Sequence, residues 1–118
     1  MLYLNAKEIR EIFSMREAIE SDREAFMIQA EGLAEVPVRT NFDVVNDGIT
    51  SFMPALIKKY PRAGIKIVST YTENYKRGMS AVSATVLLAD PETGVVNAML
   101  DGTELTRMRT GAVSGLAT

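Results

Sequence analysis

Hydrophobic and polar residues follow two different periods along this chain, helical near both ends and strand-like in the middle. Asn5 and Ser14 are each followed three residues later by a glutamate, which is the pattern of a capping box. The first box predicts a short helix to about residue 13, and the second predicts a longer helix to about residue 32. Asp22 interrupts the apolar stripe of the longer helix. The residues of that stripe, which recur near helical spacing, are Met15, Ile19, Phe26, Ala30 and Leu33.

The middle of the chain carries short apolar and β-branched runs separated by turn signals. Asn46-Asp47-Gly48 predicts a hairpin turn, because an Asp-Gly pair tolerates the positive φ that tight hairpins need. The segment 90–94 contains Pro91 and Gly94 and predicts a second tight turn. Turn residues also occupy 60–64, and a polar loop is expected over 72–80. The predicted strands cover about residues 39–45, 49–56, 65–71, 81–89 and 95–100.

The last segment predicts one more helix, with Thr103 as its N-cap and a course that continues to Thr118. Gly111 and Gly115 lie four residues apart on this helix and predict close packing against a neighbouring helix. They do not form a dinucleotide-binding fingerprint, which needs the spacing G-x-G-x-x-G directly after a strand. Two helices, about five to six strands joined mostly by hairpin-sized turns, and a final helix predict an α+β domain with a mostly antiparallel or mixed sheet.

Composition narrows the classes of function. The chain has 118 residues, enough for one domain, and a formal net charge of −2, which gives no positive field for nucleic acid. No apolar run approaches the roughly 20 residues that span a bilayer, and the N-terminus lacks the features of a signal peptide. The absence of cysteine excludes disulfides and fits a cytoplasmic protein. The absence of histidine removes the commonest metal ligand, so we expect no metal site.

Two arginines near the end of the chain differ in their surroundings. Arg107 and Arg109 point in nearly opposite directions on a helix, and Arg107 shares a stripe with polar residues that we expect in solvent. Arg109 shares the apolar stripe, so its guanidinium is expected to face a core and to bind an anion there, because an unpaired buried charge is costly. The anion is either a carboxylate of the fold, such as Asp43 or Asp101, or an external ligand.

Lys66 lies between two isoleucines in a predicted strand, so both faces of the strand are apolar around it. Desolvation there would lower the pKa of Lys66, which suits a proton shuttle or a polar anchor. Alternatively, Lys66 protects an edge strand against aggregation. Arg39, at the start of the first predicted strand, is either solvated or a third cation of the same site. Three such cations favour a pocket for a small anion, either a carboxylate or a phosphate.

Several segments of the chain occur in the order that is typical of a known family. They are Val36–Thr40, Gly64–Ser69, the loop Glu73–Gly78 and, above all, Met99–Thr118. With these segments the chain resembles the N-terminal part of the ornithine cyclodeaminase/mu-crystallin family over essentially its whole length. The resemblance implies that residues 1–118 form the family's N-terminal domain for substrate binding and dimerisation. In the family the last helix leads into a Rossmann domain, so we expect this chain to be one part of such an enzyme.

The resemblance also implies an activity. Members of the family depend on NAD or NADP and act at the α-carbon of amino acids or cyclic imino acids, as cyclodeaminases, alanine dehydrogenases or ketimine reductases. By this resemblance Arg39, Lys66 and Arg109 hold the substrate carboxylate, and Lys66 also relays a proton. Most of the cofactor site is expected outside this chain. The positions implied to contact the cofactor are Arg109, Thr110, Ala81 and Val82.

The partners implied by the resemblance are a small amino, keto or imino acid as substrate and a second copy of the chain in a homodimer. These residues alone are expected to be inactive, because they lack the pyrophosphate-binding half of a dinucleotide site. The alternative is a non-catalytic module of the mu-crystallin type, which binds a small anion or serves only for dimerisation.

Overall fold

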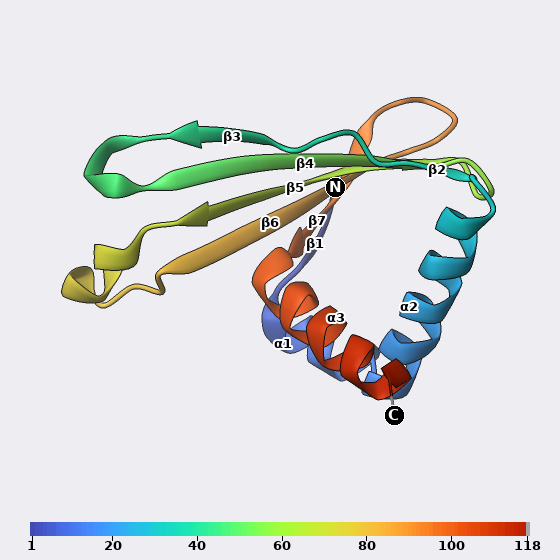
Figure 1. The fold of residues 1–118 in the computed structure, drawn as a ribbon, viewed down its shortest axis with the longest axis horizontal. Coiled ribbons are helices and arrows are strands. Elements are labelled where there is room, and N and C mark those ends of the chain that lie inside the picture. Colours follow the sequence, from blue (N-terminus) through green and yellow to red (C-terminus); the bar gives the residue numbers. More distant parts are fainter. Residues whose placement is uncertain (118) are drawn as a thin grey trace.

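A mixed sheet of seven strands, with helices below it, forms the part of the chain that the structure describes (Figure 1). The computed structural model describes residues 1–117, so Thr118, the last residue of the predicted final helix, lies outside the described residues. The strand order is β1-β7-β6-β5-β4-β2, and β3 also pairs with β4. Only β1 and β7 pair in parallel; the other described pairs are antiparallel. This confirms the predicted α+β class. The elements are β1 (Leu2–Leu4), α1 (Ala6–Ile12), α2 (Met15–Ala30), β2 (Ala34–Glu35), β3 (Thr40–Asp43), η1 (Val45–Asp47), β4 (Ile49–Ile57), β5 (Arg62–Thr70), η2 (Thr72–Arg77), β6 (Val82–Ala89), β7 (Val96–Asp101) and α3 (Gly102–Ala117).

Both predicted capping boxes are present at the starts of α1 and α2. The side chain of Asn5 accepts a hydrogen bond from the backbone N–H of Glu8 at 2.9 Å, and the Glu8 carboxylate accepts from the Asn5 N–H at 3.2 Å. Ser14 and Glu17 make the same reciprocal pair at 3.1 and 3.0 Å. Each box satisfies backbone donors that a helix start leaves without partners, so the helices begin where the sequence predicts.

The β3–β4 hairpin confirms the predicted turn but not its geometry. The positive φ angles belong to Asn46 (59°) and Asp47 (58°), not to Gly48. The Gly48 N–H donates to the Val45 carbonyl at 3.1 Å, which closes a turn with two left-handed residues. Gly48 is needed for space, because a Cβ there would lie 2.2 Å from the Tyr71 ring.

Two short edge strands and several strand ends differ from the prediction. β1 pairs with β7, and β2 pairs with the end of β4. With three and two residues, these strands are too short to show a period of their own. β3 starts at Thr40 instead of Arg39, and β5 starts at Arg62, so the turn expected over residues 60–64 is shorter. The polar loop expected over residues 72–80 contains the short helix η2.

The start of α3 corrects another prediction. Asp101, not Thr103, caps the helix: its carboxylate accepts from the Glu104 N–H at 2.9 Å. The Thr103 hydroxyl instead accepts from the Ala84 N–H at 3.0 Å and ties α3 to β6. Gly102 permits this contact, because a Cβ there would lie 2.9 Å from the backbone of Ala84. The start of α3 is therefore fixed directly against the sheet.

The close helix packing predicted from the two glycines of α3 is confirmed. A Cβ at Gly115 would lie 2.7 Å from the Ile19 side chain, and one at Gly111 would lie 3.3 Å from that of Met15. The two helices converge at the end of α3 and diverge towards the sheet, so they form a V in Figure 1. A small core joins the three helices, and its buried members are Ile9, Ala18, Met108 and Ala112.

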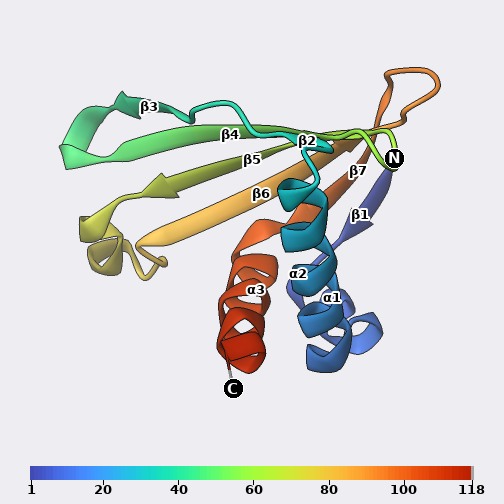
Figure 2. The ribbon, with the colours of Figure 1, turned by 45° about the vertical axis from the view of Figure 1, so that its right-hand side comes forward.

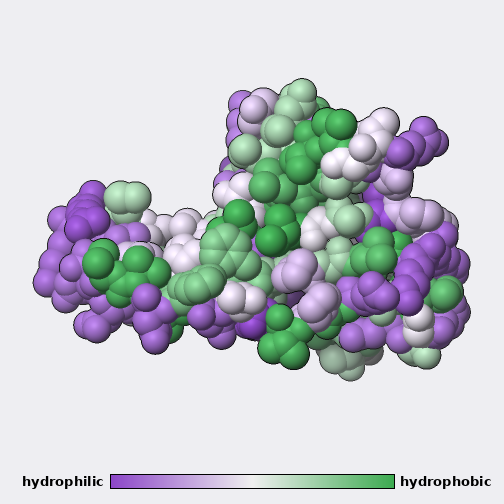
Figure 3. Space-filling model, turned by 90° about the horizontal axis from the view of Figure 1, so that it is seen from above, coloured by the Kyte–Doolittle hydropathy of each residue, from purple (hydrophilic) through white to green (hydrophobic). Residues whose placement is uncertain are grey.

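Much apolar surface is left exposed around this core. The predicted stripe of α2 is partly wrong, because Phe26 is 54% exposed while Ala18 and Ile28 are buried. Figure 2 shows the helices side by side below the sheet, and Figure 3 shows apolar surface across the molecule on the side seen from above. Val38 and Phe42 are 93% and 53% exposed. Within the described residues, no helix is both long and apolar enough to cross a membrane.

Candidate functional site

A cavity of about 270 Å³ lies between α2, α3 and the central strands β5 and β6. The two helices that line it, α2 and α3, separate towards the sheet (Figure 1). Most of its lining is apolar, and the ionisable side chains on it are those of Asp22, Lys66 and Arg109. The complete lining consists of Phe13, Ala18, Ser21, Asp22, Lys66, Val86, Leu105, Thr106 and Arg109.

Lys66 lies in the middle of the sheet. It is paired with Met53 of β4 on one side and Val86 of β6 on the other, so the edge-strand interpretation is wrong. Its Nζ donates a hydrogen bond of 3.4 Å to the hydroxyl of Thr106. Desolvation by burial lowers the pKa of Lys66, and the charges of Arg109 and Arg39 lower it further. Lys66 therefore releases a proton more easily than a lysine in water does.

Arg109 borders the cavity, but the prediction that it faces the core is wrong. The buried residues of α3 include Met108, next to Arg109 in the sequence, and Ala112, but Arg109 itself is exposed. Among the described residues it forms no salt bridge, so neither Asp43 nor Asp101 is its partner. Its guanidinium is therefore available to a ligand in the cavity.

Arg39 is exposed in the segment between β2 and β3 and is not part of the cavity lining. It is nevertheless close enough for its charge to lower the pKa of Lys66. The charges of both predicted arginines thus act on Lys66 and disfavour its protonated form. A bound anion would offset this repulsion.

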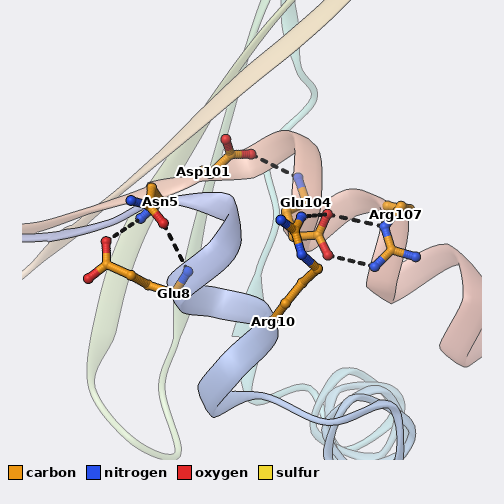
Figure 4. A network of polar contacts seen from close by, with 6 residues as sticks. All are labelled: Asn5, Glu8, Arg10, Asp101, Glu104 and Arg107. Carbon is orange, nitrogen blue, oxygen red and sulfur yellow. Dashed lines mark hydrogen bonds and ion pairs between the residues drawn. The ribbon is translucent and has the colours of Figure 1, made fainter.

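The sequence did not predict the buried carboxylate of Glu104 on α3, which is contacted by Arg107 of the same helix and Arg10 of α1 (Figure 4). Glu104 is 6% exposed, and Arg107 donates to both of its oxygens at 2.6 and 3.1 Å. Arg10 of α1 approaches the same carboxylate at 3.4 Å. The hydrogen bond from Arg107 and the charges of both arginines lower the pKa of Glu104. Arg107 is exposed as expected, but it is a structural residue that holds the Glu104 carboxylate within α3, while Arg10 links the same carboxylate to α1.

Asp22 lines the cavity, although the sequence did not assign it to the site. Its Oδ2 is buried and has no hydrogen-bond partner in the described part of the chain. The available signal was the interruption that Asp22 makes in the apolar stripe of α2. A charged residue on an inward helix face is unfavourable without a partner, and this points to a polar cavity on that side.

The other predicted cofactor positions lie near the start of β6 and on α3. Val82 is the first residue of β6 and is exposed. The carbonyl of Ala81 accepts a hydrogen bond of 2.7 Å from the N–H of Tyr71, so its backbone is engaged within the fold. Thr110 is exposed on α3, beside Arg109. Of these positions only Thr110 and Arg109 offer polar side chains to a cofactor.

Comparisons with known proteins agree on one family. The profile of the ornithine cyclodeaminase/mu-crystallin family matches residues 1–118. Alanine dehydrogenase of Archaeoglobus fulgidus is 35% identical over 116 residues, which are 98% of this chain and 35% of the relative. The chain therefore spans about a third of the length of this relative.

Two solved structures have the same fold over nearly all of this chain. Thermococcus litoralis Delta(1)-pyrroline-2-carboxylate reductase, in complex with NADH and L-proline, is 42% identical with a TM-score of 0.93, over 100% of this chain and 37% of that one. An archaeal alanine dehydrogenase dimer with bound NAD is 35% identical with a TM-score of 0.91, over 99% and 36% of the two chains. These similar structures contain a nicotinamide cofactor, and in both the matched region is little more than a third of the chain.

Proposed function

Because the chain belongs to the ornithine cyclodeaminase/mu-crystallin family, we propose that it is the substrate-binding part of an NAD(P)-dependent enzyme. The enzyme would act at the α-carbon of an amino acid or a cyclic imino acid, as an oxidoreductase or a cyclodeaminase. The observation that carries this proposal is the cavity on which Lys66 and Arg109 meet, with no carboxylate paired to either among the described residues. The enzymes among the similar proteins favour this function over a non-catalytic mu-crystallin module.

In this proposal Arg109 and Lys66 bind the substrate carboxylate, and Arg39 adds charge from the rim. The planar fork of a guanidinium suits both oxygens of a carboxylate, and the apolar remainder of the lining suits the carbon skeleton of a small acid. Lys66 has a lowered pKa and a hydrogen bond to Thr106 that fixes its position. It is therefore suited to hold or release a proton at the substrate nitrogen or at a bound water.

The residues present fit one edge of a cofactor site. Arg109 and Thr110 lie side by side on α3 with exposed side chains, while Ala81 and Val82 would add van der Waals contacts at the start of β6. The chain contains no glycine-rich dinucleotide fingerprint, so most of the site would lie in the part of the relatives that this chain does not match. NAD or NADP, when bound, would supply or accept a hydride at the substrate α-carbon.

We further propose that residues 1–118 are the dimerisation domain of the enzyme and that it works as a homodimer in the cytoplasm. One similar structure is a dimer, and this chain leaves large apolar side chains exposed, among them Val38 and Phe42. Exposed apolar surface of this kind is typical of an interface between subunits. A dimer in light scattering would support the proposal, and a monomer at high concentration would contradict it.

A thermal-shift experiment tests the proposed substrate class. L-proline and L-alanine are compared with prolinamide and alaninamide, which keep the ring or side chain but lack the carboxylate. We expect the acids to raise the melting temperature of the chain and the amides to leave it unchanged, because only a ligand that binds the folded state stabilises it. With NADH and a cyclic imino acid the chain alone should show no turnover. Stabilisation by the amides equal to that by the acids would contradict a carboxylate site, and turnover would contradict the proposed division of the cofactor site.

A further inference from the structure

Asp22 has a carboxylate oxygen for which the fold provides no partner. It lies on α2, one turn after the buried Ala18, and both residues line the cavity. Its Oδ2 is buried and makes no hydrogen bond within the described residues. Buried polar atoms in folded proteins are almost always hydrogen-bonded, and an isolated buried carboxylate is strongly unfavourable. The oxygen therefore needs a donor or a cation from outside the fold.

The cations of the cavity do not supply this partner. Asp22 forms no salt bridge with Lys66 or with Arg109, although all three line the same space. They come from different walls, since Asp22 lies on α2 while Lys66 and Arg109 lie on β5 and α3. The cavity thus presents a negative group on one wall and positive groups on the others, without contact between them.

This arrangement matches a small ligand that carries one negative and one positive group. The cavity volume of about 270 Å³ lies just below the roughly 300–1,000 Å³ of pockets for drug-sized ligands, so it suits a smaller molecule. Its other walls, which include Phe13, Val86 and Leu105, are apolar and would contact the carbon skeleton. An amino acid or a cyclic imino acid has a carboxylate and a positively charged nitrogen attached to one carbon.

We propose that Asp22 binds the positively charged nitrogen of the substrate and makes the cavity selective for zwitterions. This inference rests on the proposed function, which places the substrate carboxylate at Arg109 and Lys66. A carboxylate beside an imine nitrogen also favours the protonated form of the imine, the iminium, which reacts more readily with a hydride. Asp22 would then determine specificity, by distinguishing amino and imino acids from acids without a basic nitrogen.

A matched pair of ligands tests this inference by calorimetric titration. L-proline and tetrahydrofuran-2-carboxylate have the same ring size and the same carboxylate, but only proline has a positively charged ring atom. We expect the parent protein to bind proline more tightly. Asp22→Asn should weaken proline binding about 10-fold or more, the loss expected for one charge-assisted hydrogen bond, and should not weaken binding of the oxygen analogue. Glu24→Gln, an exposed change on the same helix, serves as the control and should alter neither affinity.

The possible failures are distinguishable. If the parent protein binds neither acid, the proposed function is wrong and the inference is wrong with it. If the parent binds both acids equally well, the carboxylate site stands and the role of Asp22 is refuted; this comparison requires no variant. If Asp22→Asn raises the affinity for both acids equally, Asp22 competes with the ligand for Arg109 and does not bind the nitrogen.

Discussion

Replacing Arg109 with alanine is expected to remove carboxylate binding and to leave the fold intact. Arg109 is exposed and forms no salt bridge with a described residue, so its loss leaves no buried carboxylate unpaired. A surface change of this kind alters the free energy of unfolding by no more than about 0.5 kcal/mol. A hydrogen bond between charged partners contributes about 1.5–3 kcal/mol, so Arg109→Ala should weaken binding of L-proline about 10–150-fold.

Arg107→Ala is the matched control, two residues away on the same helix. Arg107 donates to both oxygens of Glu104, and without it this buried carboxylate keeps, among the residues that the structure describes, the ion pair with Arg10 at 3.4 Å. We therefore expect Arg107→Ala to lower the melting temperature and to leave the affinity for L-proline unchanged. The two substitutions remove the same charge, so a difference between them reports position and not net charge.

The assay combines differential scanning fluorimetry for stability with calorimetric titration for affinity, on the parent and both variants. Retained affinity in Arg109→Ala would refute the carboxylate site at this position. An equal loss of affinity in both variants would show that a general positive field, and not the Arg109 guanidinium, attracts the acid. A large fall in melting temperature for Arg109→Ala would mean that Arg109 supports the fold.

Three further predictions concern stability. Glu104→Gln should destabilise the chain at neutral pH, and the difference in stability from the parent should shrink below about pH 4. The reason is that the lowered pKa of Glu104 stabilises the fold fully above the unfolded pKa, and this stabilisation is lost as pH falls through the folded pKa. A difference that stays constant with pH in urea titrations would contradict this prediction. Lys66→Met should raise the melting temperature of the ligand-free chain at neutral pH, because Lys66 is desolvated and repelled by two arginines. This advantage should shrink as pH rises through the lowered pKa of Lys66 and should disappear above the ordinary lysine pKa of 10.5, where the side chain is neutral in both the folded and the unfolded state. A lower melting temperature at neutral pH would refute this prediction. Ile9→Ala truncates a side chain that is only 2% exposed and should lower the free energy of unfolding in urea by about 2–5 kcal/mol. A decrease below about 1 kcal/mol would mean that the small helical core is not the main source of helix packing.

The sequence predicted the site in part. Lys66 and Arg109 were expected to share an anion site, and they line one cavity. The reason given for Arg109 was wrong, because a helical stripe is about 100° wide and its exact phase depends on the neighbouring elements. Here those neighbours bury Met108 and Glu104, and Arg109 borders the cavity instead. Asp22 interrupts the apolar stripe of α2, but no local signal shows which residues it faces.

Local signals predicted the elements because their physical causes lie within a few residues of one another. The capping boxes at Asn5 and Ser14 and the turn at Asn46 depend on contacts between residues three apart in the chain. The sequence alone therefore determined the order of helices and strands, the α+β class and the family to which the chain belongs. These features follow from local contacts and do not require knowledge of any long-range contact.

Only the tertiary structure decided which residues meet. Asp22, Lys66 and Arg109 belong to three elements more than 40 residues apart, and their positions depend on the strand order and on the close approach of α2 and α3 at Gly111 and Gly115. Burial, which sets the pKa of Lys66 and leaves the Asp22 oxygen without a partner, is a property of packed neighbours and not of spacing along the chain. The cavity and its opposite charges therefore follow from the packing of distant elements, which no local pattern specifies.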